Sequence, residues 1–265
     1  MTVTPSERVS SSVFMKMVTE DQLDDIYDAA LTVFEKTGFK MSHARAVAVC
    51  KAAGCKIEDD RVRVPREIVE QSLRLAPKGF MVYDRLGNPA LDLTGRNSYY
   101  GCSTGSPQTL DAETGEIRAT TYRDLEIGAL ACDALPNIDW VMPFGTTQDT
   151  PGHASFLYDF EACVSNTTLP VMFLSESAED SLYIHQMAAA CVGGREQLKE
   201  RPFLIAYPEP ITPLFYPDEV VNRAFLAADW GIPQCQGTTQ IIGATSPVTL
   251  AGAIVLWLAE ALMNI

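Results

Sequence analysis

Aromatic and polar side chains recur at the ends of four short apolar runs, which span residues 138–145, 170–176, 202–209 and 232–237. An earlier run, at residues 97–102, ends in the same way. The strand-end residues, as we call this set, are Tyr99, Tyr100, Cys102, Phe144, Thr146, Thr147, Ser175, Glu176, Tyr207, Glu209, Gln236, Thr238 and Thr239. Aromatic faces attract quaternary or protonated amines by roughly 0.5 to 2 kcal/mol each. The set therefore suits a site for a cationic nitrogen, although any one of these aromatics can instead pack under a loop.

The spacing of the runs indicates how the chain positions these side chains. The four later runs start roughly 30 residues apart, which is the length of a strand plus its crossover helix. This spacing predicts parallel strands, and such folds carry their chemistry at the carboxyl ends of the strands. Adding residues 97–102 gives five strands, against the eight of a closed barrel. Two architectures remain open, a complete five-stranded sheet or a barrel cut short. The final helix, at residues 248–262, is apolar on nearly every face and has no visible stop signal. Because such a helix needs cover from other elements, it favours the barrel.

Shorter motifs give weaker signals. The sequence GCSTG matches the nucleophile elbow of serine hydrolases, with Ser103 as the nucleophile. An elbow is followed by a helix, whereas residues 106–121 alternate like a hairpin, so we interpret the motif as a small-residue turn. His153 and His185 are the plausible bases, but both fall in expected crossover helices. We also expect no metal site and no nucleotide phosphate cradle, because the sequence has no HExxH, no paired-cysteine spacing, no GxGxxG and no GxxxxGK.

Local signals predict an α-rich section before the parallel strands. Thr19 and Gln22 form a capping box for a helix that ends at Gly38. A second helix over residues 42–53 and a hairpin over residues 55–65 follow.

Later helices carry start signals of the same kind. Thr121 with Asp124 and Ser177 with Asp180 form capping boxes before apolar stretches with helical periodicity. Ser246, followed by a proline, is the expected start of the last helix.

Composition limits the partners of the protein. The net charge of −14 opposes phosphate backbones and anionic membranes, so we expect neither nucleic-acid nor membrane binding. The apolar C-terminal segment falls short of the roughly 20 residues that a membrane span needs. Seven cysteines, an odd number without a CxxC pair, indicate a reducing compartment, and we expect a cytoplasmic protein.

Three longer phrases, GCSTGSPQTLDAETGEIRATTYRDL, CDALPNIDWVMPFG and GATSPVTLAGAIVLWLAEAL, resemble the trimethylamine methyltransferase family. That family includes relatives that lack pyrrolysine and act on quaternary amines such as glycine betaine. The resemblance runs from about residue 19 to the end of the sequence. It implies a TIM barrel preceded by helices, and a reaction that passes an N-methyl group to the cobalt of a cognate corrinoid protein.

The expected fold class is therefore α/β. An N-terminal helical and hairpin section spans residues 1–96, and the first part of a (β/α)8 TIM barrel spans residues 97–265. An unfinished barrel has two open edges, so we expect a homo-oligomer or pairing with a C-terminal half. Family members are longer, and the part that carries pyrrolysine in the trimethylamine enzymes has no counterpart in this sequence, so the subgroup stays open.

The strand-end pattern and the resemblance together predict roles for particular strand-end residues. Tyr100, Phe144 and Tyr207 are expected to line a cation-binding mouth, and Glu209 or Gln236 to orient a methylated amine such as trimethylamine or glycine betaine. The corrinoid (cobalamin) is expected on a partner protein, with no cofactor and no metal bound directly by this chain.

Two other functions stay open at the level of sequence. A different barrel enzyme, a lyase or hydrolase, would work through Glu209 or Ser103. A non-catalytic fragment would act as a binding or assembly module through the apolar helix at residues 248–262.

Overall fold

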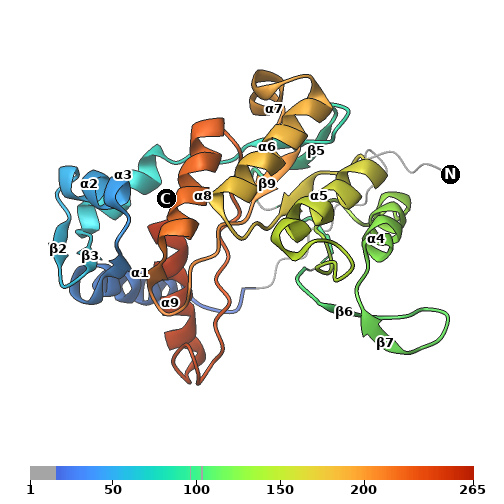
Figure 1. Ribbon diagram of the computed structural model, residues 1–265. Coiled ribbons are helices and arrows are strands. Elements are labelled where there is room, and N and C mark those ends of the chain that lie inside the picture. Colours follow the sequence, from blue (N-terminus) through green and yellow to red (C-terminus); the bar gives the residue numbers. More distant parts are fainter. Residues whose placement is uncertain (1–15, 96, 103) are drawn as a thin grey trace. The chain divides into compact units, whose positions relative to one another are not determined.

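The computed structural model describes residues 16–95, 97–102 and 104–265, which divide into two compact units (Figure 1). Within the described part, unit 1 comprises residues 16–76, 209–221 and 236–265. Unit 2 comprises residues 77–208 and 222–235.

Unit 1 contains the N-terminal helices, a small sheet and the C-terminal helix. Its elements are α1 (Glu20–Thr32), the π-helical turn η2 (Val33–Thr37), β1 (Phe39–Met41), α2 (Ala44–Ala52), β2 (Lys56–Glu58), β3 (Arg61–Arg63), α3 (Arg66–Leu75), β10 (Phe215–Tyr216), the first turn of α8 (Asp218–Trp230) and α9 (Leu250–Met263).

The first helix follows its sequence signals. Thr19 caps α1 by accepting from the backbone N–H of Gln22, whose side chain accepts from the N–H of Thr19, so the predicted capping box is confirmed. The helix passes through the turn η2 and ends at Gly38, whose φ is 68°. A β-carbon at Gly38 would lie 2.6 Å from the carbonyl oxygen of Val62, so this position requires glycine.

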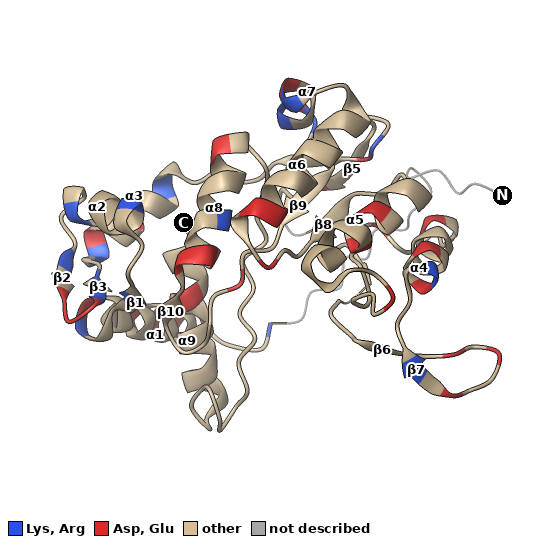
Figure 2. Cartoon of the chain, in the orientation of Figure 1, with Lys and Arg blue, Asp and Glu red and all other residues tan. Residues whose placement is uncertain are grey.

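A four-stranded sheet in the order β10, β1, β3, β2 holds unit 1 together. The predicted hairpin is confirmed as β2 paired antiparallel with β3, while β1 pairs in parallel with β10. Three buried rings form its core: Phe39 lies 4.7 Å from Phe34 and 5.9 Å from Tyr216, measured between centroids. Charged residues occur along β2 and β3 (Figure 2), where Arg63 pairs with Glu58.

Unit 2 contains two hairpins and the helices and strands with βα spacing. Its elements are β4 (Met81–Tyr83), β5 (Pro89–Asp92), β6 (Gln108–Leu110), β7 (Ile117–Ala119), α4 (Tyr122–Ala134), the 3-10 turn η3 (Gly152–Ala154), α5 (Ser155–Asn166), β8 (Val171–Phe173), α6 (Ala178–Val192), α7 (Arg195–Glu200), β9 (Leu204–Ala206) and the rest of α8.

Consecutive parallel pairing runs through unit 2. The strands β8 and β9 pair in parallel, with Val171 opposite Leu204. Single parallel bridges extend the array on both sides, and they join Gly101 to Trp140, Val141 to Val171, and Ala206 to Gln234. The predicted parallel arrangement of the five runs is thus confirmed in chain order, although three of the runs contribute isolated bridges rather than full strands.

Helices cover this array and bury its core. In sequence order α4 packs on α5 and α5 on α6 (Figure 1). The predicted capping boxes of α4 and α6 are both present. Phe160, Phe173, Leu204 and Ala227 are among the fully or nearly fully buried side chains of the resulting core. This burial explains why the strands read as continuous apolar runs rather than as alternating patterns.

Two expected helix positions are wrong. The final helix begins at Leu250 and not after Ser246, because Thr249 accepts from the N–H of Gly252 at 3.2 Å and acts as the N-cap. His153 lies in the short turn η3 rather than in a crossover helix. The other histidine, His185, does lie in a helix, α6, and is completely buried.

The hairpin β6–β7 follows GCSTG as predicted, and the motif's first glycine has a packing role. A β-carbon at Gly101 would lie 2.3 Å from the indole ring of Trp140, its partner in the array.

We expect Gly101→Ala to lower the free energy of unfolding by about 1–3 kcal/mol, because the rigid ring must move. Urea unfolding measures this. Gly152→Ala is the control, since its β-carbon meets open space; equal losses in both variants would contradict the explanation.

Burial of His185 makes stability depend on pH. Its Nδ1 lies 2.6 Å from the carbonyl oxygen of Ser181, and its ring packs between Phe173 and Trp230. Desolvation lowers its pKa to about 4 from 6.5, so the unfolded chain binds the proton more readily. The contribution of neutral His185 to the free energy of unfolding is therefore fully present above pH 6.5 and is lost as the pH falls toward 4. This residue accounts for about 2 kcal/mol between pH 7.5 and 5.

Denaturant unfolding of the protein and of His185→Leu at both pH values isolates this contribution. The variant should lose less stability on acidification than the parent. Identical pH dependence in the two proteins would show that His185 becomes charged without cost.

Candidate functional site

Two strand-end residues of unit 2 follow the central strands β8 and β9. Ser175 comes after β8 and is buried, and its carbonyl oxygen accepts a hydrogen bond from the guanidinium of Arg223 on α8. Tyr207 comes directly after β9 and is half-buried. Because β8 and β9 are parallel neighbours, both residues lie at the same edge of the array.

Tyr100 and Phe144 lie in different surroundings. The Tyr100 side chain is 68% exposed. The backbone N–H of Tyr100 donates to the carboxylate of Asp139 at 2.8 Å, and the backbone carbonyl of Tyr100 accepts from the N–H of Asp139 at 2.7 Å. The Phe144 ring lies against Gly128 of α4, where a β-carbon would come within 2.4 Å of it. Phe144 therefore contributes to packing between its strand end and α4, while its role toward a cation stays a prediction.

A buried carboxylate that was not predicted from the sequence, that of Asp159, lies near the end of the run at residues 138–145. Asp159 on α5 is almost completely buried and accepts from the backbone N–H of Thr147 at 3.1 Å. Burial raises its pKa to about 6 despite that hydrogen bond. The Thr147 hydroxyl lies 2.5 Å from that of Thr150. Asp159 thus fixes the loop that follows residues 138–145. Its position as a carboxylate in an otherwise largely apolar helix was the feature of the sequence that could have indicated this role.

In unit 1 the structure brings together Glu209 and Thr239. The Thr239 hydroxyl donates to Oε1 of Glu209, so the segments that follow two neighbouring runs are joined at this point. Gln236 lies in the same unit and is half-buried. A carboxylate held by a hydroxyl keeps a defined direction and retains a second oxygen, which suits the orientation of a cationic group.

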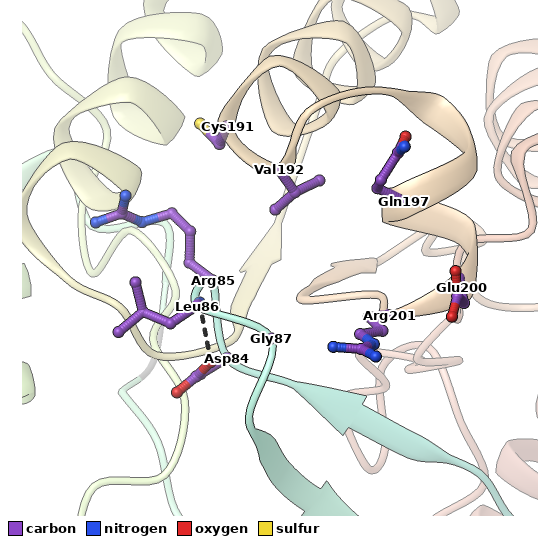
Figure 3. A pocket seen from close by; sticks show the side chains of 9 residues that line it. All are labelled: Asp84, Arg85, Leu86, Gly87, Cys191, Val192, Gln197, Glu200 and Arg201. Atoms are coloured by element: carbon purple, nitrogen blue, oxygen red, sulfur yellow. Dashed lines mark hydrogen bonds between the residues drawn. The ribbon is translucent and has the colours of Figure 1, made fainter.

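Two hollows of unit 2 lie at the opposite, amino ends of the strands. One, of about 390 Å³, is bordered by the turn between β4 and β5 and by α6 and α7 (Figure 3). In that turn the backbone N–H of Arg85 donates to the carbonyl of Thr168, just before β8. The other, of about 530 Å³, lies beside Pro202 and Pro233, which precede β9 and the bridge at Gln234. Both hollows are therefore separate from the strand-end residues of unit 2.

Other site types receive no support from the described part of the chain. It contains no group of three or more His, Cys, Asp or Glu side chains able to hold a metal ion. None of its helices is both long and apolar enough to cross a membrane. Cys102 exchanges hydrogen bonds with the backbone of Met142, donating at 2.9 Å and accepting at 3.1 Å. Ser103, the candidate hydrolase nucleophile, lies outside the described residues.

Comparison with known proteins identifies relatives along nearly the whole chain. The family model described as trimethylamine methyltransferase (MTTB) matches residues 4–265. A glycine betaine methyltransferase from Desulfitobacterium hafniense is 29% identical over 94% of this chain and 52% of its own length. Trimethylamine methyltransferases MttB from Desulfitobacterium hafniense and Methanosarcina barkeri are 28% and 24% identical, over 89% and 96% of this chain and 48% and 53% of theirs. The chain spans about half the length of these curated relatives.

The position of Phe144 against α4 generates a stability prediction. We expect Phe144→Ala to lower the free energy of unfolding by about 1–2 kcal/mol, because it removes a half-buried ring that fills the space over Gly128. Tyr100→Ala, which removes a largely exposed ring, should change stability by less than about 0.5 kcal/mol. Urea unfolding of both variants measures the difference. A Phe144→Ala protein as stable as Tyr100→Ala would contradict the packing role.

Proposed function

Because the chain belongs to the trimethylamine methyltransferase (MTTB) family, we propose that it takes part in moving a methyl group from an N-methylated amine to a corrinoid carried by a partner protein. The substrate class, trimethylamine or a quaternary amine such as glycine betaine, follows the names of its relatives. The corrinoid supplies the cobalt that accepts the methyl group.

The consecutive parallel array in unit 2 is the observation that carries this proposal. It sets five successive runs side by side, from Gly101 to Gln234, in the order expected for the first strands of a (β/α)8 barrel. We propose that the array is part of such a barrel. A barrel would place the strand-end residues at the face where TIM-barrel enzymes carry out their chemistry.

The proposed reaction makes modest chemical demands on the protein. The C–N bond breaks and its electron pair stays on nitrogen, while the new bond to the methyl carbon would take its electron pair from the cobalt of the corrinoid. A quaternary ammonium leaves as a neutral amine and needs no general acid, and trimethylamine would leave as neutral dimethylamine when it is bound in its protonated form. The site must instead exclude water around the cation and aim one methyl carbon outward. Aromatic faces compensate the lost hydration through their quadrupole. The few histidines of the chain are consistent with this requirement.

We assign roles on this basis to strand-end residues. Tyr207, half-buried at the end of β9, is the proposed aromatic face for the ammonium group. Tyr100, with its exposed ring, and Phe144 are secondary candidates, since Phe144 already packs on α4. Glu209, held by Thr239, is the proposed carboxylate that orients the substrate, with Gln236 as a further polar group.

Amine binding and methyl transfer test the proposal on the protein that carries this chain. Calorimetry with glycine betaine and trimethylamine, and the absorbance change of cobalamin on methylation, give the two readouts. Tyr207→Ala should weaken amine binding about ten-fold, the loss expected for one cation–π contact of roughly 1–2 kcal/mol. Tyr207→Phe keeps the aromatic face and should bind nearly as well as the parent.

Glu209→Gln extends the same experiment to the carboxylate. It should weaken binding while leaving thermal stability nearly unchanged, because the amide oxygen can still accept from Thr239. Binding that is unaffected in both Tyr207→Ala and Glu209→Gln would refute the assigned site. The absence of binding and transfer with every N-methylated amine would refute the proposed function.

A further inference from the structure

Unit 1 contains a fully buried carboxylate that the proposed reaction does not use. Glu260 lies on the inner face of α9 and is 0% exposed. Its Oε1 accepts from the backbone N–H of Leu214 at 2.7 Å, and its Oε2 accepts from the hydroxyl of Thr212 at 2.9 Å. The Tyr216 hydroxyl donates to its backbone carbonyl. Every one of these partners belongs to the segment at residues 209–216 that follows β9.

This segment adopts a backbone that needs support. Leu214 has a φ of 57°, in the left-handed region, which costs a residue with a β-carbon roughly 1–2 kcal/mol. Its N–H is bound by Glu260, and its carbonyl accepts from the N–H of Lys40 on β1 at 2.8 Å. The Leu214 peptide is therefore held on both sides, by α9 and by the small sheet.

The segment that follows the next run is anchored to the same helix. The side-chain amide of Gln240 lies against α9. In the amide orientation that satisfies both of its polar atoms, it donates to the carbonyl of Ala253 at 3.1 Å and accepts from the backbone N–H of Trp257 at 2.9 Å. The two segments of unit 1 that follow a run, residues 209–216 and 236–240, are thus both hydrogen-bonded to α9. They meet at the hydrogen bond between Glu209 and Thr239.

We propose that Glu260 is a positioning residue for Glu209. Its carboxylate fixes the segment three to five residues beyond Glu209, and so sets the direction in which Glu209 meets Thr239 and a bound amine. A purely structural role would be met by any side chain that fills the space. Two acceptor oxygens aimed at a hydroxyl and an N–H instead define one conformation of the segment. The amine-binding part of this inference rests on the proposed function, and the conformational part does not.

Hydrogen exchange and amine binding test the two parts separately. In Glu260→Ala we expect faster exchange at the Leu214 amide and also across residues 236–240, together with about ten-fold weaker binding of glycine betaine or trimethylamine. Glu260→Gln, which keeps an acceptor for Leu214, should restore most of the exchange protection and binding. Thr212→Val, which removes a single donor, should give an intermediate effect and provides a second test if Glu260→Ala does not fold.

Val69→Ala is the matched control, because it truncates a buried side chain on α3 in the same unit. It should lower the melting temperature without changing exchange at residues 209–216 and 236–240. Faster exchange at Leu214 with no change at residues 236–240, or unchanged amine binding in Glu260→Ala, would overturn the positioning role. If the parent protein binds no amine, the proposed function fails, and exchange at residues 236–240 alone decides whether Glu260 positions Glu209.

Discussion

Parallel backbone pairing across unit 2 is the constraint on which the rest of the structure depends. The N–H of Val171 donates to Phe203 at 2.8 Å, and the N–H of Ala206 donates to Pro233 at 2.9 Å. Buried strands must satisfy these groups with one another, since water is excluded from the core. Parallel pairing then requires a crossover helix after each strand, and these helices cover the array. It also aligns the carboxyl ends of the strands at one edge, which is where the strand-end residues of unit 2 lie.

Local signals predicted much of this fold because they act over a few residues. The capping boxes at Thr121 and Ser177 satisfy N–H groups within three residues of each cap, so sequence suffices to find them. Spacing predicted the parallel order. The start of α9 was missed because Ser246 and Thr249 carry equivalent capping chemistry, and only the three-dimensional path of the chain selects Thr249. The extent of each strand was overestimated, since pairing partners set strand length.

The candidate site was less accessible to sequence reasoning. Glu209 and Thr239 belonged to the strand-end set, but their hydrogen bond joins positions 30 residues apart. The orientation of Phe144 depends on how its strand end meets Gly128 of α4, which the apolar pattern does not encode. Glu260 stands in a helix that otherwise reads as apolar. Its partners lie 46 and 48 residues earlier in the chain, so nothing close in sequence indicates them.

Family membership and the parallel array support one account of function, in which the carboxyl ends of the strands hold a methylated ammonium group against an aromatic face. A crystal structure of the protein soaked with glycine betaine or trimethylamine tests this account most directly. We predict the ammonium nitrogen within about 6 Å of the Tyr207 ring centroid, beyond the carboxyl ends of β8 and β9. An amine bound instead at the amino ends, in the hollow beside Arg85 and Arg201, would contradict it.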